Sequence, residues 1–111
     1  MAGMPTADGD PFDALGDPNR RTIVELLREG PMSVSEICRR MPISQPAVSR
    51  HLRLLKGARL VADRPDGAKR LYSLSGEGAE AVREYMMRIW GDAAARFQLA
   101  ADNTTDPSVE S

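Results

Sequence analysis

The sequence predicts a mainly helical fold with one small β-hairpin. Over most of the chain, apolar residues recur at three- and four-residue spacing, the period of an amphipathic helix that faces a core. One stretch departs from this period, because residues 60–64 and 69–74 are short strand-like runs on either side of the turn-forming segment 65–68. Ser and Asp residues at N-cap positions divide the remaining chain into about five helices.

The length of 111 residues allows one compact domain and is too short for two independent cores. Residues 1–10 and 101–111 are small, polar and acidic, so we expect flexible tails around a single domain at 11–100. The chain contains one cysteine, no secretory signal pattern and no apolar run of bilayer length. These features favour a cytoplasmic protein without disulfides or a membrane partner.

Charge is unevenly distributed, although the net charge is only −1. Between Arg39 and Arg70 there are nine Lys or Arg residues and two acidic ones, a local balance of +7, so the remaining residues carry −8. A basic middle between acidic ends can direct a polyanion to one surface, because Lys and Arg contacts to phosphate supply most nonspecific nucleic-acid affinity. A solvated surface of mixed charge is the alternative explanation.

The first two predicted helices precede the basic segment. A short helix is expected at 12–15. Asp17 and Pro18 then open a helix that runs to about residue 29, because Asp is a preferred N-cap and Pro is tolerated in the first turn. Gly30 ends it. The apolar residues that share one face of this helix, and that should pack in the core, are Ile23, Leu26 and Leu27.

Two further helices follow at the spacing of a helix-turn-helix. Ser33 and Glu36 form the Ser-x-x-Glu pattern of a capping box, so a short helix should end before Pro42. Ser44 caps the next helix, which runs to Gly57. A pair of helices joined by about three residues is typical of the helix-turn-helix motif. The hairpin that follows would be its wing, which makes the predicted fold a winged helix-turn-helix.

The helix at 44–57 has a polar face opposite its apolar stripe. Gln can pair with the adenine edge and Arg with the guanine edge, while Ser can bond to phosphate or base, so this face has the chemistry of major-groove recognition. A solvated polar surface is the alternative. The apolar stripe contains Val48, Leu52 and Leu55. The candidate DNA-binding residues are Ser44, Gln45, Pro46, Ser49, Arg50 and Arg53, with Arg64, Lys69 and Arg70 on the wing.

A last helix is predicted at 76–100, with Ser75 as its cap. Its apolar stripe is longer than so small a domain can easily bury alone. Packing in the core or in a dimer is the commoner explanation of such a stripe, and a small-molecule pocket is the alternative.

Neither the single histidine nor the single cysteine has an obvious set of partners. A zinc site normally needs at least three protein ligands, so we expect no metal and no cofactor, and His51 is better explained as a structural or phosphate-contacting group. Cys38 stands beside two arginines and could be a redox sensor, although an inert half-buried thiol is commoner.

We expect no enzyme, because no nucleophile has a plausible base and no glycine-rich phosphate loop is present.

Three segments resemble the ArsR family of bacterial repressors. They read LGDPNRR at 15–21, SQPAVSRHL at 44–52 and LLKGARLV at 54–61, and a hairpin ending RLYSL at 70–74 follows. The resemblance covers residues 11–99, and it is specific because the blocks occur in family order at family spacing. It implies a homodimer whose two recognition helices enter successive major grooves of a palindromic operator. The first and last helices would pair in that dimer through Phe12, Leu15, Val82, Met86, Ile89, Trp90, Ala93 and Phe97.

The resemblance also implies a branch of the family without the usual metal sites. Metal-sensing members often carry Cys-x-Cys before the recognition helix, where this chain has Ser33 and Ser35, and Cys38 falls near a third, less essential position. The other common site uses histidine in the last helix, which has none here. We therefore expect a repressor, with its own operon as one candidate target. The alternatives are an inducer- or redox-responsive regulator with a small-molecule site at the last helix, whose inducer is unknown, and a winged-helix module that binds protein.

Overall fold

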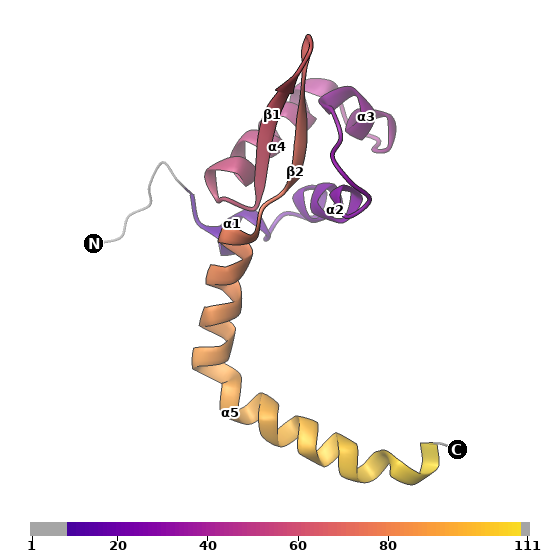
Figure 1. Ribbon diagram of the computed structural model, residues 1–111, viewed down its shortest axis with the longest axis vertical. Helices are drawn as coiled ribbons and strands as arrows, with labels where there is room; N and C mark the ends of the chain where they lie inside the picture. The colour runs from indigo at the N-terminus through magenta and orange to yellow at the C-terminus, as the bar shows by residue number, and fades with distance from the viewer. Residues whose placement is uncertain (1–8, 110–111) are drawn as a thin grey trace, which may run out of the picture. The chain divides into compact units, whose positions relative to one another are not determined.

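The computed structural model describes residues 9–109, with side chains described for 9–93. Over this range the chain forms five helices and one two-stranded antiparallel sheet (Figure 1). The elements are α1 (Pro11–Ala14), α2 (Pro18–Leu27), α3 (Val34–Arg39), α4 (Gln45–Gly57), β1 (Val61–Asp66), β2 (Lys69–Leu74) and α5 (Gly76–Val109). The predicted mainly helical fold with a small hairpin is confirmed. Helix α5 continues past residue 100, where we expected it to end.

Contacts divide the chain into two compact units, Met1–Ala81 and Val82–Ser111. The first unit contains α1 to α4, the hairpin and the first turns of α5, and the second contains the remainder of α5. None of the helices in the described range is long and apolar enough to span a membrane.

Helices α1 to α4 each begin at a capping side chain. Asp10, Asp17 and Ser44 each accept a hydrogen bond from a backbone N–H in the first turn that follows. At α3 the capping box is complete, because the Ser33 hydroxyl accepts from the Glu36 N–H at 3.2 Å and the Glu36 carboxylate accepts from the Ser33 N–H at 2.8 Å. These local hydrogen bonds explain why the helices start where the sequence predicts.

Helix α4 lies at the centre of the apolar core. It packs against α2, α3 and β1, and Figure 1 shows the hairpin running alongside it. Its predicted apolar stripe is buried, which leaves its polar face outside. The largest fully buried side chains of the core are Ile23, Ile37, Val48, Leu52, Leu55 and Val61.

The hairpin has a shorter turn than the sequence predicts. Strand pairing runs from Val61 opposite Leu74 to Asp66 opposite Lys69, so the loop contains only two residues. The first of them, Gly67, has a φ of 64°, as such tight turns require. Pro65, which we assigned to the turn, lies in β1, where the missing N–H is tolerated because this strand has a partner on one side only.

The base of the hairpin is tied to the rest of the domain at two points. Tyr72 of β2 exchanges backbone hydrogen bonds of 2.8 and 3.0 Å with Met32, just before α3. On the other side, the Gly78 N–H of α5 donates to the Arg59 carbonyl at 2.8 Å. A Cβ atom at Gly78 would lie 2.5 Å from the Ala58 carbonyl oxygen, so only glycine allows this close approach.

Candidate nucleic-acid interface

Helix α4 carries most of the candidate DNA-binding residues on its exposed face. Among the described residues, Arg50 and Arg53 form no hydrogen bond and no ion pair with another side chain. Ser44 is exposed at the N-cap, where its hydroxyl oxygen accepts from the Ala47 N–H at 3.3 Å. The exposed side chains that the structure brings together at this helix are Ser44, Gln45, Pro46, Ser49, Arg50 and Arg53.

The candidate wing residues lie on both strands near the turn. Arg64 belongs to β1, Lys69 and Arg70 belong to β2, and all three are exposed. In the strand register, Arg70 faces Pro65 across the hairpin. The wing therefore carries three cations beside its two-residue loop, and one of them already has a partner within the protein.

That partner is Asp63, which sequence reasoning missed. Its side chain is only 7% exposed and lies between two cations, with Oδ1 3.0 Å from Lys56 Nζ and Oδ2 2.8 Å from Arg70 Nε. Hydrogen bonds from Arg70 and then from Lys56 hold the pKa of the Asp63 carboxyl below its usual value. A signal was present in the sequence, because Asp63 follows the buried Val61 at a spacing of two and therefore shares the inward face of β1.

His51 lies on the buried face of α4 and is 6% exposed. Its Nδ1 lies 3.3 Å from a guanidinium nitrogen of Arg20, whose Nε donates to the Ala14 carbonyl at 2.8 Å. The Asp17 carboxylate that caps α2 is 3.9 Å from the same imidazole nitrogen. Burial lowers the pKa of His51, against an opposing effect of Asp17. Of the two explanations given for His51, the structure supports the structural one, a link between α4 and the α1–α2 corner.

Cys38 is half-buried in α3, where its thiol donates to the Ile43 carbonyl at 3.5 Å. Both neighbouring arginines are exposed, and Arg40 pairs with Glu29 at 2.9 Å. Among the side chains that the structure describes, no three His, Cys, Asp or Glu residues are placed to hold one metal ion.

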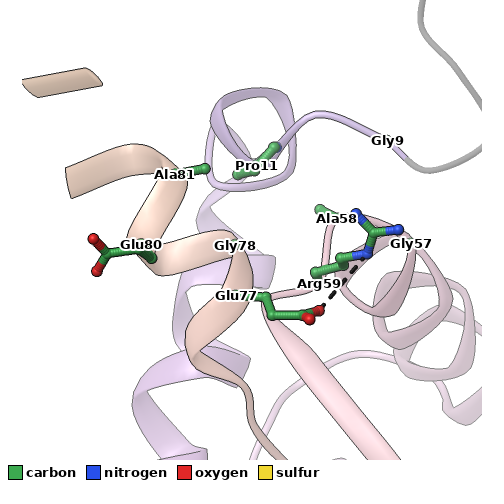
Figure 2. A pocket seen from close by; sticks show the side chains of 9 residues that line it. All are labelled: Gly9, Pro11, Gly57, Ala58, Arg59, Glu77, Gly78, Glu80 and Ala81. Atoms are coloured by element: carbon green, nitrogen blue, oxygen red, sulfur yellow. Dashed lines mark ion pairs between the residues drawn. The ribbon is translucent and has the colours of Figure 1, made fainter. Parts of the chain in front are cut away.

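A pocket of about 480 Å³ lies at the C-terminal end of α4, at the other end of that helix from Gln45. Figure 2 shows Arg59 and Glu77 facing each other at this pocket, with an ion-pair distance of 3.7 Å. The pocket touches only the first turns of α5 and contains no residue of the apolar stripe on which the small-molecule alternative is based. Its lining is formed by Gly9, Pro11, Gly57, Ala58, Arg59, Glu77, Gly78, Glu80 and Ala81.

The predicted dimer residues include large apolar side chains at the surface of the single chain. In the last helix, Met86, Ile89 and Trp90 are 48%, 52% and 50% exposed, and in α1 Phe12 is 41% exposed. The remaining members differ in exposure. Leu15 and Val82 are half-buried, Ala93 is exposed, and Phe97 lies outside the residues whose side chains are described.

Comparison with known proteins places this fold and site in a family. The sequence model described as "Bacterial regulatory protein, arsR family" matches residues 17–63, which run from the N-cap of α2 into β1. The HTH-type transcriptional regulator Rv2034 of Mycobacterium tuberculosis is 45% identical over 95 residues, which cover 86% of this chain and 89% of that protein. The transcriptional repressor SdpR of Bacillus subtilis is 41% identical over 64 residues, 58% of this chain and 71% of that one.

A solved structure agrees with these relatives in fold and sequence. The crystal structure of a possible transcriptional regulator for arsenical resistance superposes with a TM-score of 0.68 at 34% identity, covering 82% of this chain and 95% of the other. The protein therefore belongs to the ArsR family of bacterial regulatory proteins, and it is a DNA-binding transcriptional regulator rather than an enzyme.

Proposed function

We propose that this protein is a homodimeric repressor that binds a palindromic operator through α4 and the wing. The observation that carries the proposal is the exposed face of α4, where Arg50 and Arg53 have no partner among the described side chains. Arginine without an internal partner can pair with guanine in the major groove. Repression is supported by SdpR, which is named as a transcriptional repressor. The protein would act in the cytoplasm, where operator DNA is found.

Each α4 residue then has a distinct role at the operator. Gln45 would read adenine, Arg50 and Arg53 would read guanine or bind phosphate, and Ser44 and Ser49 would donate to phosphate or base. Pro46 would contact the DNA through its ring. On the wing, Arg64 and Lys69 would bind phosphates. Arg70 would do so through the guanidinium nitrogens other than Nε, which bonds to Asp63.

The homodimer is proposed because one recognition helix reads only a short half-site. Two copies of α4 separated by one turn of DNA, about 34 Å, would read both halves of a palindrome. The exposed apolar residues Met86, Ile89 and Trp90 of α5 support an interface that one chain leaves open. The proposed interface contains these three residues together with Phe12, Leu15, Val82, Ala93 and Phe97.

The proposal is tested by titrating the purified protein against the DNA upstream of its own gene. Binding would be followed by fluorescence anisotropy at two salt concentrations, with excess unrelated DNA as competitor. We expect saturable, competitor-resistant binding that weakens at higher salt, because phosphate contacts release counterions. Binding no stronger than to the competitor would exclude autoregulation. Absent DNA binding together with a salt-insensitive protein partner would favour the protein-binding module.

An inducer-responsive regulator is a second candidate function, supported by the pocket at the end of α4. The lining includes Gly57 and Ala58 of the α4 C-terminus and Glu77 and Gly78 of α5, so a ligand there would touch the recognition helix directly. A small molecule that raises the thermal midpoint and lowers operator affinity would establish this function. If no compound in a ligand library has both effects, the result would contradict an inducer function for this pocket.

A further inference from the structure

Asp63 joins the two elements that are proposed to contact DNA. One carboxylate oxygen pairs with Lys56 in the last turn of α4, and the other pairs with Arg70 on β2. The carboxylate is almost completely buried, whereas Lys56 and Arg70 are each about half exposed. A buried charge is tolerated only when it is paired and hydrogen-bonded, so this arrangement depends on both cations.

Asp63 lies at a position on the hairpin where its contact with Lys56 can influence the orientation of the wing. In the strand register Asp63 lies opposite Tyr72, the residue whose backbone is bonded to Met32. The hairpin is therefore held on two sides at one rung, by Met32 through the backbone and by Lys56 through Asp63. A two-stranded ribbon has little stability of its own, so the direction of the tip beyond this rung depends on these anchors.

The charge of Asp63 works against simple attraction to DNA. A carboxylate among cations reduces the field that attracts phosphate, and its loss alone would raise the affinity for any duplex. Any contribution of Asp63 to operator recognition must therefore come from the orientation that it gives the wing. Elements held in the orientation that a bound partner requires lose less freedom on binding, and only the correct partner gains from that fixed orientation.

We propose that Asp63 is a positioning residue that fixes the wing relative to the recognition helix and thereby increases discrimination between operator and unrelated DNA. This inference rests on the proposed function of α4 and the wing. The basic segment would then contribute to binding in two ways. Its exposed cations attract any DNA, and the orientation that the buried Asp63 carboxylate imposes on the wing favours the operator over unrelated DNA.

The Asp63→Asn substitution distinguishes positioning from charge neutralisation, since asparagine has the same shape without the charge. If Asp63 positions the wing, operator affinity falls while affinity for unrelated DNA stays equal or rises, and the ratio between them drops about tenfold. If Asp63 only neutralises charge, both affinities rise by the same factor and the ratio is unchanged, which would overturn the inference. The matched control is Asp66→Asn, which removes the same charge from the exposed tip and should leave the ratio unchanged.

A second substitution, Lys56→Met, breaks the same contact from its exposed partner. We expect it to lower the ratio as well, and the double variant should be no worse than Asp63→Asn alone, because Asp63→Asn already breaks the ion pair with Lys56. Thermal unfolding would check that each variant is folded at the assay temperature. A wild-type protein that fails to prefer its operator would refute the proposed function and this inference together. A wild-type preference that both variants retain would refute the inference alone.

Discussion

At the scale of single residues, Arg50 offers the most direct test of base recognition. It is exposed near the middle of α4 and has no partner among the described side chains. Replacement by alanine should weaken operator binding by about 1–3 kcal/mol if the guanidinium pairs with guanine. The loss should be much smaller on unrelated DNA, and competition titrations with both duplexes would measure the difference.

The control for this substitution is Arg28→Ala, which removes one positive charge from the exposed C-cap of α2. It changes the net charge equally but lies outside the proposed interface. Equal losses in the two variants would mean that Arg50 contributes only general electrostatic attraction.

His51 should make the stability of the protein depend on pH near neutrality. Its pKa is lowered in the folded state by burial, so below about pH 6.5 the unfolded chain takes up a proton before the folded chain does. Stability is therefore complete above about pH 6.5 and should decrease as the pH falls toward the lower, folded-state pKa. Urea unfolding at about pH 7.5 and about pH 5.5 would show this decrease.

The His51→Gln variant keeps a hydrogen-bonding side chain and removes the titrating group, so its urea midpoint should change less between the two pH values. The carboxyls with lowered pKa values, such as Asp63 and Glu36, titrate below their ordinary values of 3.8 and 4.5 and leave this window unaffected. The same pH dependence in both proteins would assign the effect to another group.

These residues also show how far the sequence predicts the candidate site. The exposed face of α4 was predictable because helical period alone decides that Arg50 lies opposite Leu52 and Leu55. The contacts of Asp63 and His51 were not predictable, because each of these residues joins elements that are distant in sequence or of different type. The signal for Asp63, an acid on the inward phase of a strand, exists in the sequence, but its partners depend on how the hairpin lies against α4.

At the scale of elements, local hydrogen bonds account for what was predictable. Asp17, Ser33 and Ser44 cap the helices that they were predicted to cap, because a cap and its acceptor lie within one turn. The hairpin turn was predicted too long, since Pro65 is typical of turns and its place in β1 depends on β1 having no second neighbouring strand within residues 9–109. The residue at which β1 ends therefore depends on tertiary structure and not on local sequence alone.

The end of α4 and the first turn of α5 pack closely at Gly78. Gly78→Ala should destabilise the protein by about 1–3 kcal/mol, because the new Cβ would lie against the backbone oxygens of Ala58 and Arg59. Gly76→Ala is the matched control in the same helix, where a Cβ meets nothing within 4 Å. Chemical denaturation would compare the two. An equal effect of both substitutions would show that the junction is not tightly packed.

At the scale of the whole molecule, DNA binding should depend on dimerisation. Met86→Asp places a charge in the proposed interface and should convert a dimer to a monomer in sedimentation experiments. Operator affinity should then fall about a hundredfold or more, because the two half-sites are no longer bound by one linked unit. Arg88→Gln, with the same change of charge on another face of α5, should remain dimeric. A Met86→Asp protein that sediments as a dimer would place the interface elsewhere.

In the proposed complex, two copies of α4 read a palindrome with the help of the wing. Its most direct test is selection of genomic fragments by the purified protein, followed by hydroxyl-radical footprinting of the selected sites. We expect an inverted repeat whose half-sites are centred about 34 Å apart, protected symmetrically by the wild type and more weakly by Arg50→Ala at the same protein concentration. Recovery of fragments without a shared repeat, or equal protection by the Arg50→Ala protein, would contradict the claim.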